Sequence, residues 1–182
     1  MHATPKVTRK VQKLAAESYE TDDIGRIRVK RSIIRDNPYG CYRVVIVEDN
    51  VAYKLIRNPD EVAVNRFEWR FWYSLPAGLR RLTAKPLAIS NCGKVVAFEY
   101  VPEILASAGY KWEEEKRIQS SFNSKLCALL RDNGFSDHEI ELLTLDNHCG
   151  NIGVRPNGEL VWLDFCSPEV LHAKNLENLP QY

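Results

Sequence analysis

The chain has 182 residues, of which 45% are hydrophobic and 27% are charged. This length is enough for one compact unit with a real core, because a domain of this size buries about two-thirds of its unfolded surface. The 25 basic and 24 acidic side chains give a net charge of +1, which argues against a protein that coats nucleic acid through a uniformly basic surface.

The cysteines and the apolar segments indicate a reducing environment. The five cysteines form no Cys-x-x-Cys pair, and the four histidines show no zinc-finger spacing. The sequence has no signal-peptide pattern and no run of 18 apolar residues. We therefore expect a cytoplasmic protein without disulfide bonds and without membrane attachment.

The amino-terminal segment predicts a basic helix. Residues 5–20 have the apolar spacing of a short amphipathic helix. Residues 1–34 contain eight Lys and Arg side chains against four Asp and Glu, so the leader at residues 1–24 is positively charged. Such a leader could contact an acidic partner or nucleic acid, but a solvated helix is the simpler interpretation.

Strand patterns follow the leader. The alternation at residues 26–30 and the β-branched run at 42–47 are both typical of strands. Glu48-Asp49-Asn50 predicts a tight turn into a third strand, which carries Val51-Ala52-Tyr53-Lys54. We expect these strands to form one small sheet, with the lysine on the third strand.

The remainder of the chain predicts two main helices and two short strands. We expect helices at residues 60–75 and 112–131, a further helical turn within 135–143, and strands at 95–101 and 159–163. The long helix should stop at Asp132-Asn133-Gly134, because Gly favours the position that follows a helix end. No internal repeat or low-complexity segment interrupts this order.

Five polar residues stand out because their order suits phosphoryl transfer. They are Lys54, Glu68, Asp146, Asn151 and Asp164. Phosphoryl transfer depends on positioning and on charge neutralisation, so it needs a lysine for the nucleotide phosphates and oxygen ligands for the metal ions. Each residue is common by itself, but the joint order and spacing are difficult to obtain by chance.

These residues and their local contexts resemble the protein-kinase-like superfamily, in both its eukaryotic and its aminoglycoside-phosphotransferase types. Val51-Ala52-Tyr53-Lys54 is similar to the Val-Ala-Ile-Lys strand of kinases. Asp146 and Asn151 have the five-residue spacing of the catalytic loop, and Asp164 follows an apolar strand as the metal-binding aspartate does. Glu68 lies in a helical stretch where the family has the glutamate that pairs with the lysine.

The resemblance implies an α+β fold of the protein-kinase-like type. Its parts would be the leader at 1–24, an antiparallel-sheet small lobe at 25–103 and a truncated helical large lobe at 104–182. The cofactors would be ATP and Mg²⁺. The implied roles are catalytic for Lys54, Glu68 and Asp146, nucleotide binding for Ala52, Lys54, Glu99 and Val101, and metal binding for Asn151 and Asp164.

The sequence also departs from the family pattern. Gly40 is the single glycine where kinases have a glycine-rich loop over the phosphates, and Cys166 replaces the glycine of Asp-Phe-Gly. Gly153 stands where a bulky apolar residue usually lies beneath the adenine, so that floor should be thin. Only 18 residues follow Asp164, which leaves no room for the helical platform that binds protein substrates.

Three interpretations remain open from the sequence. The first is a minimal ATP- and Mg²⁺-dependent phosphotransferase with an unknown acceptor. The second is a pseudokinase-like, non-catalytic interaction or regulatory protein, in which a protein partner or self-association covers the truncated lobe; nucleic acid is not expected. The third is an ordinary α+β domain in which the resemblance is coincidental. A cysteine-nucleophile role for Cys149 with His148 is disfavoured, because no separate base or oxyanion signature accompanies them.

Overall fold

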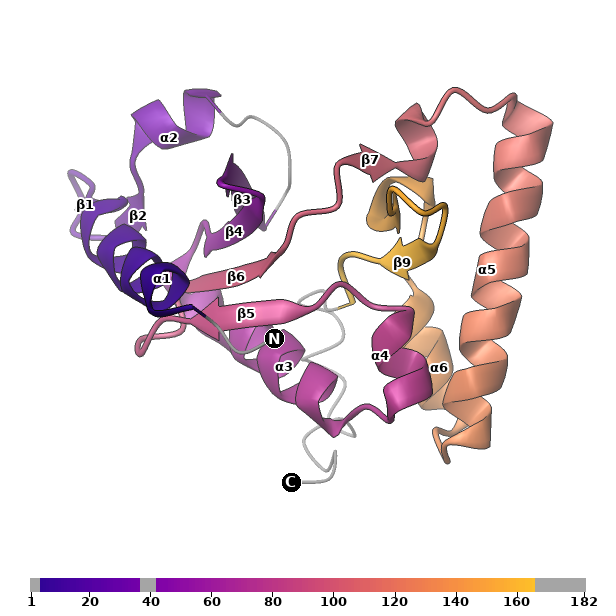
Figure 1. Ribbon diagram of the computed structural model, residues 1–182. Coiled ribbons are helices and arrows are strands. Elements are labelled where there is room, and N and C mark those ends of the chain that lie inside the picture. Colours follow the sequence, from indigo (N-terminus) through magenta and orange to yellow (C-terminus); the bar gives the residue numbers. More distant parts are fainter. Residues whose placement is uncertain (1–3, 37–41, 166–182) are drawn as a thin grey trace. The chain divides into compact units, whose positions relative to one another are not determined.

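The computed structural model describes residues 4–36 and 42–165, and the chain divides into two compact units (Figure 1). Unit 1 comprises residues 1–70 and 85–100, and unit 2 comprises residues 71–84 and 101–182. Helices and antiparallel sheets occur in both units, so the fold belongs to the predicted α+β class. Within the described residues, no helix has the length and apolar content needed to cross a membrane.

A four-stranded antiparallel sheet forms the centre of unit 1. Its spatial order is β3-β4-β6-β5, with β3 at Arg43–Glu48, β4 at Val51–Ile56, β5 at Pro86–Ile89 and β6 at Val95–Glu99. Asp49 and Asn50 connect β3 to β4 with φ angles of 52° and 58°, the left-handed values of a two-residue type I′ turn. The predicted tight turn is confirmed, and it sets Val45 opposite Lys54 in register.

The amino-terminal helix packs on one face of this sheet. This helix, α1 (Pro5–Glu17), begins with Thr4 as its cap and Pro5 at its first position, a common arrangement at helix starts. The apolar cluster under α1 contains Val11, Val29, Val44, Val51, Tyr53, Leu55, Ala88, Val95 and Ala97. The segment between α1 and β3 contains the hairpin of β1 (Tyr19–Thr21) with β2 (Ile27–Val29) and the helix α2 (Arg31–Asp36).

Two lysines of α1 form ion pairs with acidic residues of unit 1. Lys6 Nζ lies 2.6 Å from the Asp49 carboxylate, and Lys10 Nζ lies 2.6 Å from that of Glu48. Helix α1, which the sequence assigned to a separate leader, is therefore part of unit 1, with Val11 buried against the sheet. Its lysines bind the acidic turn between β3 and β4, which is closer to the solvated-helix interpretation than to a free basic arm.

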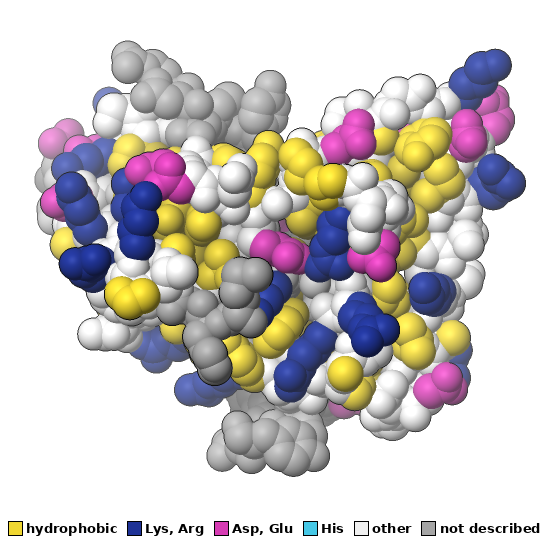
Figure 2. Space-filling view, in the orientation of Figure 1, with side chains coloured by type: hydrophobic (Ala, Val, Ile, Leu, Met, Phe, Trp, Pro, Cys, Tyr) yellow, Lys and Arg dark blue, Asp and Glu magenta, His cyan; other side chains and the backbone are white. Residues whose placement is uncertain are grey.

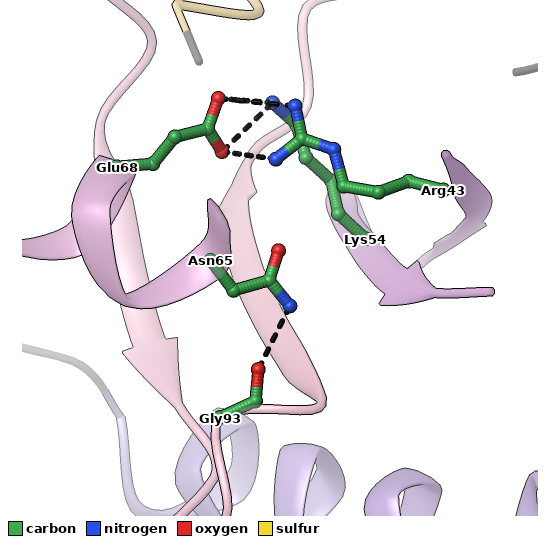
Figure 3. Close-up of polar contacts among 5 residues, drawn as sticks. All are labelled: Arg43, Lys54, Asn65, Glu68 and Gly93. Atoms are coloured by element: carbon green, nitrogen blue, oxygen red, sulfur yellow. Dashed lines mark hydrogen bonds and ion pairs between the residues drawn. The ribbon is translucent and has the colours of Figure 1, made fainter. Parts of the chain in front are cut away.

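Helix α3 (Val62–Ser74) follows the short 3₁₀ turn η1 (Pro59–Glu61) and carries Glu68. Asn58 caps this start with its side chain and Pro59 follows it, close to the predicted helix start at residue 60. Asn65 of α3 is buried, and its Nδ2 donates to the Gly93 carbonyl at 3.0 Å, which ties the helix to the β5–β6 turn (Figure 3).

Unit 2 combines a long helix with a small three-stranded sheet. Its elements are α4 (Ala77–Arg81), β7 (Glu103–Ile104), η2 (Leu105–Ser107), α5 (Trp112–Asp132), α6 (Asp137–Thr144), η3 (Cys149–Asn151), β8 (Ile152–Val154) and β9 (Leu160–Trp162). The sheet order is β7-β8-β9, antiparallel throughout. The segment around Thr83 lies parallel to β9, where Trp162 donates to the Leu82 carbonyl and accepts from the Ala84 N–H.

The unit boundaries differ from the predicted lobes at 25–103 and 104–182. The end of α3 belongs to unit 2 because the Phe71 ring packs against Phe135 and Phe165 there. The predicted stop of the long helix is present, with Gly134 at a φ of 86°. The predicted helical turn after it is the eight-residue helix α6, which begins with a Ser136–Glu139 capping box. The predictions for Gly40 and Cys166 fall outside the described residues.

Candidate functional site

The predicted ion pair between Lys54 and Glu68 is present in unit 1. Lys54 Nζ lies 3.4 Å from both carboxylate oxygens of Glu68 (Figure 3). Lys54 is 7% exposed and Glu68 is fully buried. The Lys54 ammonium group also lies 4.4 Å from the centroid of the Phe98 ring, a favourable position over the ring face.

Arg43 is a third member of this cluster, and the sequence interpretation missed it. Its Nη1 lies 2.5 Å from Glu68 Oε2 and its Nη2 lies 3.1 Å from Oε1. Arg43 is only 5% exposed. The sequence alone carried no signal for it, because the β3–β4 register, in which Val45 is the partner of Lys54, is what puts Arg43 on the same face as the lysine; residues two apart on a strand share a face.

Arg43 and Lys54 contact the Glu68 carboxylate with different geometries. The planar guanidinium of Arg43 makes a two-point contact with the carboxylate, the strongest geometry for such a pair. Lys54 makes two longer contacts with the same oxygens. Glu68 is thus fixed mainly by Arg43, and it holds in turn the ammonium group of Lys54. An ammonium group has three N–H donors, so this arrangement can orient Lys54 toward an anion.

An exposed apolar strip lies on the same sheet face as Lys54. Val47 pairs in register with Ala52, and Val45 pairs with Lys54. Val45 is 40% and Val47 is 48% exposed. Because directly opposed residues of neighbouring strands have their side chains about 5 Å apart, these valines extend the surface of Ala52.

The backbone at Glu99, one of the predicted nucleotide-binding residues, is partly engaged within unit 1. The Glu99 N–H donates to the Lys85 carbonyl at 2.8 Å, and the Tyr100 N–H donates to the Asn50 carbonyl at 3.3 Å. A contact between Glu99 and the adenine edge would therefore have to use the Glu99 carbonyl. Val101, another predicted nucleotide-binding residue, is buried and belongs to unit 2.

In unit 2, Asp146 and Asn151 contact each other directly. Asn151 Nδ2 donates to the Asp146 backbone carbonyl at 2.8 Å and lies 3.2 Å from Asp146 Oδ2. The Asn151 N–H donates to the His148 carbonyl at 2.8 Å. The two residues with the five-residue spacing therefore lie at the ends of a loop that these hydrogen bonds close. The bonds hold the Nδ2 group of Asn151 in place, and its Oδ1 can serve as a metal ligand.

Helix α5 anchors this loop through Asn147, which the sequence interpretation did not identify. Gln119 Nε2 and Asn123 Nδ2 both donate to the Asn147 carbonyl at 3.2 Å, and Asn147 Nδ2 donates to Asn123 Oδ1 at 2.9 Å. Asn147 is almost completely buried. Gln119 and Asn123 are four residues apart, so they share one side of the helix. These two polar residues, four apart on the predicted long helix, were the feature of the sequence that indicated a polar contact between this helix and another part of the chain.

Asp164 lies at the end of the β8–β9 hairpin that also begins at Asn151. The Leu163 N–H donates to the Asn151 carbonyl at 2.9 Å, so Asp164 directly follows the residue that pairs with Asn151. The described residues contain no group of three or more His, Cys, Asp or Glu arranged to hold a metal ion. An amide and one carboxylate suit a Mg²⁺ ion that obtains its other ligands from water and phosphate.

The two neighbouring residues His148 and Cys149 do not form an activated nucleophile. The Gly150 N–H donates to His148 Nδ1 at 3.0 Å, and His148 Nε2 lies 3.6 Å from Asp146 Oδ1. A hydrogen bond with Glu115 and partial burial raise the pKa of the Cys149 thiol. A raised pKa disfavours the thiolate that a cysteine nucleophile requires.

Two neighbouring side chains lie close to the backbone of Gly153. A Cβ atom at Gly153 would lie 2.8 Å from Leu163 Cδ2 and 2.8 Å from Val101 Cγ1. The absence of a side chain at this position therefore makes room for Leu163 and Val101.

The comparisons with known proteins give no family for this chain. No family model matches the sequence, and no curated protein matches it. The candidate site therefore depends on the geometry of the two units and on the residue pattern.

Proposed function

We propose that the chain is an ATP- and Mg²⁺-dependent phosphotransferase with a minimal protein-kinase-like fold. The observation that carries the proposal is the buried Arg43–Glu68–Lys54 cluster, which orients a lysine on a sheet face beside an exposed apolar strip. Lys54 would bind the nucleotide phosphates, and the surface around Ala52 would contact the adenine. Glu99 and Val101 would contact the adenine edge through their backbone groups.

The loop and hairpin of unit 2 would supply the groups for the metal and the acceptor. Asn151 and Asp164 would hold Mg²⁺, and Asp146 would accept or orient the proton of the acceptor hydroxyl. The support for this part is the Asn151–Asp146 contact, which leaves an amide oxygen and a carboxylate in one short loop. The acceptor is proposed only as a hydroxyl-bearing molecule.

Calorimetric titration with ATP, with and without Mg²⁺, tests the nucleotide site. The variants are Lys54→Met and Asp164→Asn, with the exposed Lys13→Met as the matched control. We expect Mg²⁺-dependent binding in the wild type and the control, a loss of at least about tenfold for Lys54→Met, and loss of the Mg²⁺ dependence for Asp164→Asn. Equal binding by all four proteins, or no binding near millimolar ATP, would refute the proposal.

A second candidate is a non-catalytic, pseudokinase-like regulatory protein that binds nucleotide or a protein partner. The observation that favours it is the close engagement of Glu68 by Arg43, at 2.5 Å, against 3.4 Å for Lys54. A carboxylate occupied in this way attracts the lysine less strongly. The two candidates differ in one measurement, the fate of the γ-phosphate of ATP with Mg²⁺. Its transfer to water or to one of a set of added hydroxyl-bearing acceptors supports the enzyme, whereas nucleotide binding without transfer to any of them supports the regulatory protein.

A further inference from the structure

A groove with a volume of 690 Å³ lies within unit 2, between α4, α5 and the turn that leads into β9. No residue of this groove has a role in the proposed phosphoryl transfer. Figure 2 shows Lys and Arg side chains set among hydrophobic ones over the region of α4 and α5. The groove therefore combines an apolar surface with positive charge.

The floor of the groove is apolar. It consists of Leu82, Ile118, Phe122, Leu129 and Leu160. Leu82, Ile118, Leu129 and Leu160 are partly buried, so they retain surface that a ligand can cover. Phe122 is buried, so its ring is not open to stacking. A floor of this kind favours an aliphatic partner surface over a stacked base.

The rim of the groove is basic. Its cations are Arg81, Arg117 and Lys125, against the single acid Glu159. Glu159 already lies 3.6 Å from Arg155 Nη1, and Arg117 makes only an exposed contact of 3.8 Å with Glu114. Because exposed contacts of this length stabilise little, the rim retains an excess of positive charge.

The basic and apolar residues of α5 follow the helix repeat. Arg117 and Lys125 are eight residues apart, a separation of about 12 Å along the axis at 1.5 Å per residue. Ile118 and Phe122 lie beside them, four residues apart. A partner helix with acidic side chains at i and i+7 or i+8 presents carboxylates at the same spacing as the two cations of α5. If these carboxylates flank an apolar stripe, the helix can pair with the cations and cover the apolar floor at the same time.

We propose that this groove binds an acidic amphipathic helix of a partner protein. The apolar stripe of the partner helix packs on Leu82, Ile118 and Leu160, and its carboxylates face Arg81, Arg117 and Lys125. Three cations are few for a nucleic-acid surface, which uses many phosphate contacts. The inference is independent of the phosphotransfer chemistry and holds for an enzyme or a regulatory protein.

A displayed library of random 16-residue peptides, selected on the full chain, tests the proposal. The enriched peptides are then measured by fluorescence anisotropy against the wild type, Arg81→Glu/Lys125→Glu and Ile118→Ser. The matched control is Arg9→Glu/Arg26→Glu, which reverses two exposed cations of unit 1. Far-UV circular dichroism and thermal melting confirm that each variant is folded.

We expect the enriched peptides to be acidic, with apolar residues spaced i, i+3/i+4 and i+7. The charge reversal should weaken binding by at least about tenfold, Ile118→Ser should weaken it less, and the control should not change it. Failure to enrich peptides, enrichment of basic or uncharged sequences, or equal binding by the charge-reversed protein would overturn the proposal. Displacement by oligo(dT) would overturn it in favour of nucleic acid, and concentration-dependent self-association abolished by the charge reversal would favour a second copy.

Discussion

The Arg43–Glu68–Lys54 cluster predicts that its two cations contribute very differently to stability. Arg43→Met and Lys54→Met each replace a buried cation by an apolar side chain of similar length. If Arg43 is the main partner of Glu68, Arg43→Met should destabilise the protein strongly. Lys54→Met should be tolerated, because Glu68 keeps its two-point contact with Arg43.

The distances by themselves separate the two attractions by only about 2 kcal/mol, so the predicted ranking depends on which cation remains paired with Glu68 after the other is removed. With an effective dielectric constant of about 20, opposite unit charges attract by about 7 kcal/mol at 2.5 Å and about 5 kcal/mol at 3.4 Å. Removing one partner of a buried ion pair costs about 3–5 kcal/mol, and we expect this loss for Arg43→Met. Lys54→Met also removes the desolvation cost of Lys54 and its repulsion with Arg43, so we expect a loss of about 1 kcal/mol or less.

Urea unfolding followed by tryptophan fluorescence measures both losses. Two of the four tryptophans, Trp69 and Trp72, lie on α3, the helix that carries Glu68. Equal slopes of the unfolding free energy against urea would show that the variants unfold the same amount of surface. Hydrogen exchange at the amides of β3 and β4 gives a second readout that is local to the cluster.

A single result would refute this ranking. If Lys54→Met lowers the free energy of unfolding as much as Arg43→Met does, the shorter contact does not identify the main partner of Glu68. Glu68→Gln is the reference, because it removes the carboxylate from both ion pairs and should cost about 3–5 kcal/mol. A small loss for Glu68→Gln would show that the cluster contributes little to stability.

Three further predictions concern unit 2. Asn151→Asp keeps an oxygen for the metal but loses the donor to the Asp146 carbonyl, so the Mg²⁺ affinity of the ATP complex should fall about tenfold in calorimetry. Gly153→Ala puts a methyl group 2.8 Å from two side chains and should cost about 1–3 kcal/mol in thermal denaturation. Ser136→Ala should cost about 1 kcal/mol. The hydrogen bonds from Ser136 lower the pKa of Glu139 below its ordinary value of 4.5. The stabilisation by the ionised Glu139 is therefore fully present above this pH, and the free energy of unfolding measured by chemical denaturation should fall as the pH is lowered further.

The sequence predicted best those features that local chemistry determines. The turn at Asp49 and Asn50 follows from two residues that tolerate positive φ between alternating strands. The Lys54–Glu68 pair followed instead from the resemblance of the two local contexts to the protein-kinase-like superfamily, and the structure contains this ion pair. The end of α5 followed from Gly134, because few other residues adopt its left-handed conformation.

The sequence could not predict features that depend on which elements pack together. Nothing in the sequence distinguishes Arg43 from a solvated strand residue, because only the β3–β4 register shows that it shares a face with Lys54. The sequence predicted the basic helix that carries Lys6 and Lys10, but not that these lysines pair with the acidic turn between β3 and β4. Phe71 continues the helical pattern of α3 without interruption, so its membership of unit 2 becomes visible only through its ring contacts.

The nucleotide proposal and the groove proposal involve residues that can be varied independently. Lys54 belongs to unit 1 and the groove cations Arg81 and Lys125 belong to unit 2. Loss of ATP binding in Lys54→Met with unchanged peptide binding would establish two separate functions. Peptide binding in a protein that binds no ATP would favour the regulatory interpretation. If both variants lose both activities while they remain folded, the two sites are energetically coupled, and ATP should then change the affinity for the peptide by the same factor as the peptide changes the affinity for ATP.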